Sequence, residues 1–163
     1  MFAVGDYVVY GSNGICMVKD ISKIDIPGAP SDRMYYLLSP IGLKESKIYS
    51  PVDNTKVIMR SVLTKDEANV LLKEIHTIPE MAEVNDKMME LKYKEVLASC
   101  DLKQLVSLIK TIKKKQQKRM DEGKKITSTD ERYLKKAEDA LFDELTIALS
   151  KDREEVEAFI AGL

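Results

Sequence analysis

The stretch of this sequence best suited to binding chemistry is KTIKKKQQKRMDEGKK, residues 110–125, which carries eight Lys and Arg residues. Lysine ammonium groups bind phosphates as point charges and release counterions. Such a run therefore favours binding to nucleic acid that does not depend on the base sequence. A helix here turns Ile109 and Ile112 inward and places four basic residues toward one side: Lys110, Lys113, Lys114 and Lys118. The solvated face of an amphipathic helix explains the same pattern, so both interpretations stay open.

The remaining reactive side chains do not form a catalytic pattern. The chain has one histidine, His76, and two cysteines, Cys16 and Cys100, which lie far apart. Metal sites need several ligands at close spacing, and GSNG at 11–14 lacks the Lys-Ser/Thr and following helix of a phosphate loop. We therefore expect a protein without catalytic residues, cofactor or metal, which is not an enzyme.

Charge is distributed unevenly along the chain, although the net charge is only −1. Residues 101–136 hold twelve Lys/Arg against five Asp/Glu, a net charge of +7, and residues 137–163 hold two against eight, a net charge of −6. This separation suggests a polyanion-facing element beside an acidic one. The cysteine usage, the lack of a signal sequence and the lack of a long apolar run predict a cytoplasmic protein.

The first sixty residues have the two-residue period of β-strands. VGDYVVYGSNGICMV, residues 4–18, predicts two strands joined by a tight turn at Ser12-Asn13-Gly14. Further strands are expected at 17–26, 34–39, 47–52 and within 53–60. Five strands in so short a stretch predict a small Tudor-like or SH3-like β barrel.

From residue 64 onward the period becomes helical. TKDE is a capping box with Thr64 at the N-cap, and Pro79 is expected in the first turn of a helix at 80–99. Further N-caps are expected at Asp101, in TSTDE at 127–131, and at Asp152. The fold class is therefore α+β in two domains: residues 1–62 as the β barrel and residues 63–163 as a bundle of four to five helices.

Several motifs resemble the CarD/CdnL/TRCF family of bacterial transcription regulators. They are FAVGDYVVYGSNGICMVKDI, YYLLSP, KIYSPVDN, the MRSVLTKDEA junction and LASCD before the basic helices. The resemblance covers nearly the whole chain. Transcription-repair coupling factors share only the barrel, so this chain looks like a stand-alone CarD-like member.

The resemblance implies a division of labour between the two domains. The Tudor-like domain is expected to bind the RNA polymerase β subunit by strand addition, and the helical domain to contact promoter DNA at the upstream edge of the bubble. The implied polymerase-binding residues are Lys23, Ile24, Lys47, Tyr49 and Pro51. The candidate DNA-binding residues are Lys87, Lys92, Lys110, Lys113, Lys114, Lys118 and Arg119.

The sequence departs from the family at the residues expected to make these contacts. Tyr49 and Ile24 stand where the family has exposed arginines, and Asp86 stands where it often has a Trp that wedges into the minor groove. Met88 and Met89 are candidate replacements for that wedge. Two other interpretations remain open: a protein adaptor on polymerase without DNA contact, and a ribosome- or RNA-binding module.

Overall fold

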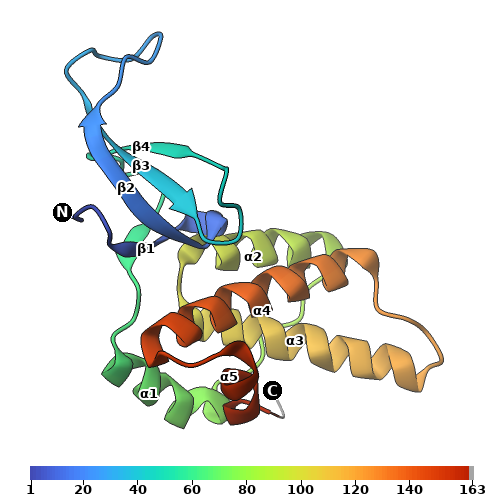
Figure 1. Cartoon of the computed structure of the whole chain (residues 1–163). Coiled ribbons are helices and arrows are strands. Elements are labelled where there is room, and N and C mark those ends of the chain that lie inside the picture. Colours follow the sequence, from blue (N-terminus) through green and yellow to red (C-terminus); the bar gives the residue numbers. More distant parts are fainter. Residues whose placement is uncertain (162–163) are drawn as a thin grey trace. The chain divides into compact units, whose positions relative to one another are not determined.

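The computed structural model describes residues 1–161, and it divides between Val62 and Leu63 into two compact units. We call residues 1–62 the β unit and the residues from Leu63 onward the helical unit (Figure 1). The described part of the chain contains no helix that is long and apolar enough to cross a membrane.

The β unit is a five-stranded antiparallel sheet with the order β4-β3-β2-β1-β5. Its strands are β1 (Tyr7–Tyr10), β2 (Ile15–Lys23), β3 (Met34–Pro40), β4 (Ile48–Pro51) and β5 (Met59–Ser61). The two edge strands are therefore β4 and β5. The strand predicted within 53–60 begins only at Met59 and runs to Ser61, because 53–58 forms turns and irregular backbone instead.

The turn between β1 and β2 is longer than the predicted tight turn. Residues Gly11–Asn13 form a short 3-10 helix, η1, and Gly14 follows with a φ of 73°. Gly11 has a φ of 49°, and a Cβ at this position would lie 2.7 Å from Cγ1 of Val57. Only glycine fits both this left-handed backbone and this close approach.

The core of the β unit consists of alternate side chains from its central strands. The buried members are Val8, Tyr10, Cys16, Val18, Tyr36 and Leu38. The Tyr36 hydroxyl accepts a hydrogen bond from the N–H of Phe2 at 3.2 Å, so the ring is buried with its polar end satisfied. Burial raises the pKa of the Cys16 thiol to about 11, so Cys16 packs here as a small hydrophobic side chain and not as a reactive thiolate.

The helical unit contains five α-helices and one short 3-10 helix among its described residues. They are α1 (Lys65–Glu74), η2 (Ile75–Thr77), α2 (Asp86–Ser99), α3 (Leu102–Asp121), α4 (Ser128–Leu149) and α5 (Arg153–Phe159). Ile109 and Ile112 of α3 are buried as predicted, and they pack in one core with residues of α4 and α5 such as Leu141 and Val156.

The predicted helix starts are confirmed where a local side chain forms the cap. Thr64 and Glu67 make the expected capping box. The side chains of Asp101, Thr127 and Asp152 each accept a backbone N–H in the first turn of α3, α4 and α5. These caps satisfy donors that the helix itself leaves unpaired, which is why the starts can be read from short motifs.

The predicted helix at 80–99 is wrong over its first part. Residues 78–85 are not helical, and α2 begins at Asp86 after Asn85, whose side chain accepts the N–H of Met88 at 3.0 Å. The N–H of Met81 instead donates to Oγ1 of Thr111 at 2.8 Å. This long-range bond satisfies the donor without a helix, and the Met81 side chain packs against the core from an extended segment.

Candidate interaction surfaces

Strand β4 presents an edge of the sheet that no other strand of the described chain occupies. Its inner side pairs with β3, with Tyr49 opposite Leu37 and Pro51 opposite Tyr35. Ser50 is fully buried, whereas the neighbouring Tyr49 is 45% exposed, as the two-residue period of a strand requires. The edge therefore combines unpaired backbone groups with an accessible aromatic side chain.

The other predicted polymerase-binding residues lie at the two ends of the sheet, and not all of them are on the β4 edge. Lys23, the last residue of β2, pairs with Met34, and Met34 also accepts the N–H of Val52, which follows Pro51. Lys23 and Pro51 thus lie at the same end of the sheet, with the half-buried Ile24 just beyond β2. Lys47 is exposed and precedes β4 at the other end.

A polar clamp, which the sequence motifs do not reveal, fixes the PVDN segment after β4. Arg33 donates to Oδ1 of Asp53 through both Nε at 3.1 Å and Nη2 at 2.9 Å. The Asn54 amide donates to Oγ of Ser50 at 3.2 Å and to the hydroxyl of Tyr10 at 3.4 Å. These bonds tie the turn to β1, to β4 and to the residue before β3, and so hold the end of the edge strand in place.

Comparison with known families assigns this unit. Residues 2–63 match the family model of the CarD-like/TRCF RID domain. The β unit is a CarD-like RNA polymerase-interacting domain. The match confirms the resemblance to the CarD/TRCF family over the β unit, and it supports RNA polymerase binding as the activity of this unit. No curated protein matches the chain.

This CarD-like domain precedes a helical unit in which Lys110 has a structural position. Its Nζ donates to the carbonyl oxygens of Ile75 and Ile78, each at 2.7 Å. The ammonium group therefore satisfies the carbonyls that follow α1, and Lys110 does not direct its charge to solvent. This placement argues against Lys110 as a phosphate-binding residue.

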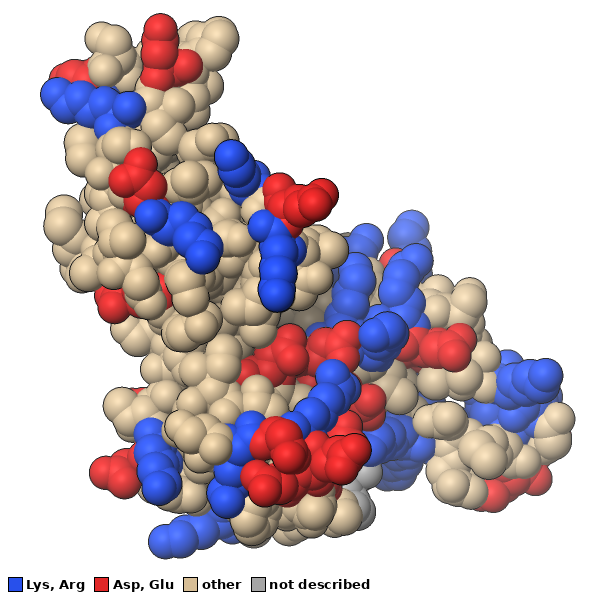
Figure 2. Space-filling view, in the orientation of Figure 1, with Lys and Arg blue, Asp and Glu red and all other residues tan. Residues whose placement is uncertain are grey.

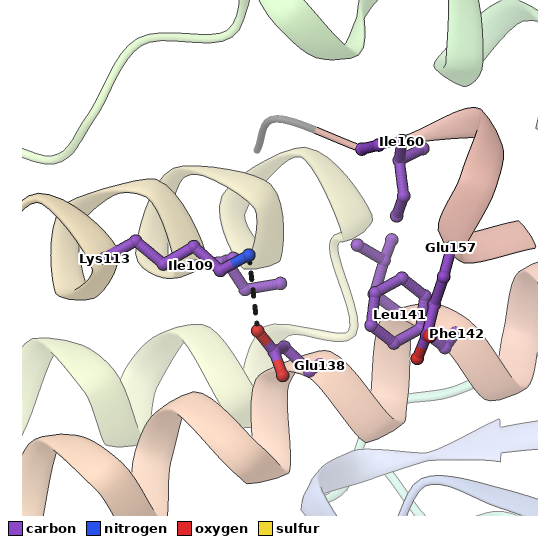
Figure 3. Close-up of a pocket in the computed structure, with 8 residues that line it drawn as sticks. Ile109, Lys113, Glu138, Leu141, Phe142, Glu157 and Ile160 are labelled. Atoms are coloured by element: carbon purple, nitrogen blue, oxygen red, sulfur yellow. Dashed lines mark ion pairs between the residues drawn. The ribbon is translucent and has the colours of Figure 1, made fainter. Parts of the chain in front are cut away.

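The next lysines of α3 are paired with carboxylates from other elements. Lys113 lies 3.6 Å from Glu138 of α4, and Lys114 lies 3.9 Å from Glu80. Figure 3 shows the Lys113 side chain directed toward Glu138 beside a pocket of about 270 Å³ between α3, α4 and α5. Its wall combines apolar side chains such as Leu141 with charged ones, among them Lys113 and Glu138. The helix face predicted to be basic is therefore partly neutralised within the unit.

Lys115 belongs to a network that crosses three helices. Its Nζ lies 3.1 Å from Oδ2 of Asp130, which is 4% exposed, and 3.9 Å from Oδ1 of Asp86. Oδ1 of Asp130 accepts the hydroxyl of Tyr93 at 3.1 Å. Burial, with the nearby charge of Asp130, raises the pKa of Tyr93 far above its ordinary value. A buried carboxylate with these two partners stabilises the packing of α2, α3 and α4.

Three of the predicted DNA-binding lysines have side chains that make no ion pair or hydrogen bond with the described chain: Lys87, Lys92 and Lys118. Arg119 differs, because its Nε donates to the carbonyl of Lys125 at 2.7 Å and fixes the turn after α3. Figure 2 shows basic and acidic side chains interleaved over the visible face of the helical unit. That face is not a continuous basic surface.

Of the two candidate wedge residues, only Met88 is accessible. Met88 is 47% exposed, as is Leu91 one turn later on α2, whereas Met89 is 3% exposed and belongs to the core. Asp86, at the position of the family Trp, is the first residue of α2. Its negative charge there interacts favourably with the positive end of the helix dipole. The outer face of α2 therefore has Met88 and Leu91 beside the free ammonium groups of Lys87 and Lys92.

Proposed function

We propose that this protein is a non-enzymatic transcription regulator that binds the β subunit of bacterial RNA polymerase and contacts promoter DNA weakly. The observation that carries the proposal is the CarD-like RNA polymerase-interacting domain with a free edge strand, β4, that exposes Tyr49. A protein of this kind acts in the cytoplasm, bound to the nucleoid through polymerase.

The β4 edge supports strand addition as the mode of polymerase binding. Backbone N–H and C=O groups along an edge strand bind an added strand, and adjacent side chains determine which strand fits. Tyr49 offers a large contact area at a low cost in side-chain entropy. Because Tyr49 stands where the family has an Arg, specificity here rests more on aromatic packing and less on charge pairing.

The outer face of α2 supports the contact with DNA. Lys87 and Lys92 are free to bind phosphates, and Met88 and Leu91 offer apolar contacts to a partly opened duplex. Much of the charge of α3 is neutralised by carboxylates, so we expect low affinity for free DNA. Tethering to polymerase raises the effective DNA concentration, and contacts of this strength then alter the lifetime of the open complex.

The salt dependence of DNA binding tests this contact. We expect the variant Lys87→Gln/Lys92→Gln to bind unrelated duplexes more weakly and to equal degrees. The slope of log K against log salt should become shallower by roughly 0.9 for each phosphate that the variant no longer binds. The matched control is Lys65→Gln/Lys73→Gln on α1, which removes the same charge. If both variants have the slope of the parent protein, α2 does not contact DNA.

The ion pairs of α3 favour a second candidate, a protein adaptor on polymerase that does not bind DNA. Lys113, Lys114 and Lys115 each have a carboxylate partner within 3.9 Å. If the protein is such an adaptor, we expect it to bind polymerase but to have no measurable affinity for DNA, even at low salt. Recovery of ribosomal proteins in place of polymerase from a lysate would favour the RNA-binding alternative.

A further inference from the structure

An acidic segment of the helical unit lies along the basic side of α3. Residues 78–86, which connect η2 to the first residue of α2, contain Glu80, Glu83 and Asp86 and no Lys or Arg. We call these residues the acidic strap. Because the strap is not helical before Asp86, its carboxylates can follow α3 and need not be distributed around a helix of their own.

The strap is anchored at its first residues. Lys110 donates to the carbonyl of Ile78 at 2.7 Å, and the N–H of Met81 donates to Oγ1 of Thr111 at 2.8 Å. The side chains of Ile78 and Met81 are partly buried against the core of the helical unit. These contacts keep the carboxylates that follow close to the middle of α3.

Beyond the anchor, a groove of about 550 Å³ separates the strap from α3. Glu80 and Glu83 line one side, and Lys114, Lys115 and Lys118 line the other. Two ion pairs cross between the elements, Glu80 to Lys114 at 3.9 Å and Asp86 to Lys115 at 3.9 Å. Apart from Lys115, whose ammonium is also held by Asp130, these groups are well exposed to solvent.

We propose that the acidic strap is an intramolecular competitor that keeps nucleic-acid phosphates from the lysines of α3. Exposed ion pairs at these distances contribute little to stability, so phosphates at high local concentration can replace the carboxylates. At low local concentration the strap prevails because it belongs to the same chain. The free protein then binds bulk DNA only weakly, and α3 contacts DNA only after polymerase has brought the two together. This inference rests on the proposed contact with DNA.

The experiment compares two triple variants of the full chain that change the charge equally. The strap variant is Glu80→Gln/Glu83→Gln/Asp86→Asn. The control is Glu95→Gln/Glu131→Gln/Glu154→Gln, at exposed residues outside the strap that have no ion pair among the described residues. Binding to a short duplex of arbitrary sequence is measured by fluorescence anisotropy over a range of salt concentrations. We expect the strap variant to bind about tenfold more tightly than the control, with a slope steeper by roughly 0.9 per released lysine.

A second pair of variants separates failure of this inference from failure of the proposed DNA contact. Lys114→Gln/Lys118→Gln, added to the strap variant, should abolish the gain, and both lysines are on the surface, away from the buried Asp130. If the strap variant binds like the control while the parent protein with Lys87→Gln/Lys92→Gln loses affinity, the strap is not a competitor but α2 still contacts DNA. If none of the variants changes DNA binding, both proposals are wrong.

Discussion

The lysines of α3 show that identical side chains in one run serve different purposes. Lys110 hydrogen-bonds two backbone carbonyls, Lys115 neutralises the buried Asp130, and the ammonium group of Lys118 has no partner in the described chain. A count of charges along residues 110–125 treats these lysines as equivalent, although their side chains have different contacts in the folded structure. Only the free lysines can exchange water for phosphate without breaking an internal bond.

Replacement of Lys110 tests its structural role. Lys110→Met keeps an unbranched apolar stem but removes the ammonium, so the carbonyls of Ile75 and Ile78 lose their charged donor. We expect the free energy of unfolding to fall by about 2 kcal/mol, because hydrogen bonds to charged groups are worth roughly 1.5–3 kcal/mol. Urea denaturation measures the change, and Lys118→Met, the control, should change it by less than about 0.5 kcal/mol. Equal effects of the two substitutions would show that Lys110 is an ordinary surface lysine.

The sequence predicted the candidate site only where local chemistry determines it. Exposure of Tyr49 follows from strand alternation, and its place on an edge strand was implied by the resemblance. The partners of Lys113 and Lys115 are Glu138 and Asp130, which come close only when α3 and α4 pack. No short motif encodes such a pair, so the neutralisation of α3 could not be predicted.

At the scale of elements, the helix caps were predictable and the acidic strap was not. Thr64, Asp101, Thr127 and Asp152 act within their own first turns. In the strap, Met81 and Val84 have helical spacing with later apolar residues, and Pro79 is compatible with a first turn, so the periodicity indicated a helix. The distant hydroxyl of Thr111 overrides that preference by binding the N–H of Met81.

The contact between α4 and α5 makes stability depend on pH in a residue-specific way. Arg153 of α5 donates to Asp139 of α4 at 2.9 Å and to Glu157 at 3.0 Å. Burial raises the pKa of Asp139, but hydrogen bonds from Arg153 and Lys135 outweigh it, and the pKa lies below its ordinary value of 3.8. Asp143, one turn later, has a raised pKa because of burial and the charge of Asp139.

These opposite shifts predict opposite effects of two matched substitutions. A raised pKa means that ionised Asp143 costs stability above its folded pKa, and this cost fades as the pH falls toward 3.8. Asp143→Asn should therefore raise the free energy of unfolding at pH 7 and lose this gain near pH 3. Asp139→Asn should lower the free energy of unfolding at pH 7, and that loss should fade as the pH falls from 3.8 toward the depressed pKa. Thermal unfolding at both pH values measures the effects, and equal signs would contradict the assignment.

At the scale of the whole molecule, the two units have separate cores and different means of binding. The β unit has a CarD-like domain with an open edge, and the helical unit has scattered cations with carboxylates close to many of them. In the proposed function the first unit determines where the protein binds, and the second acts once that position is reached. Polymerase binding is therefore expected to be strong, and DNA binding weak and conditional.

The central claim is that the β4 edge binds RNA polymerase, and the affinity of the full chain for purified core polymerase tests it most directly. Tyr49→Glu places a charge on the exposed position of β4, and Tyr7→Glu makes the same change at an exposed Tyr of β1. We expect Tyr49→Glu to weaken binding by about tenfold or more, as removal of a central aromatic side chain does, and Tyr7→Glu to leave it within about twofold. Parent-like affinity of a folded Tyr49→Glu protein would contradict the claim and place the polymerase-binding surface elsewhere.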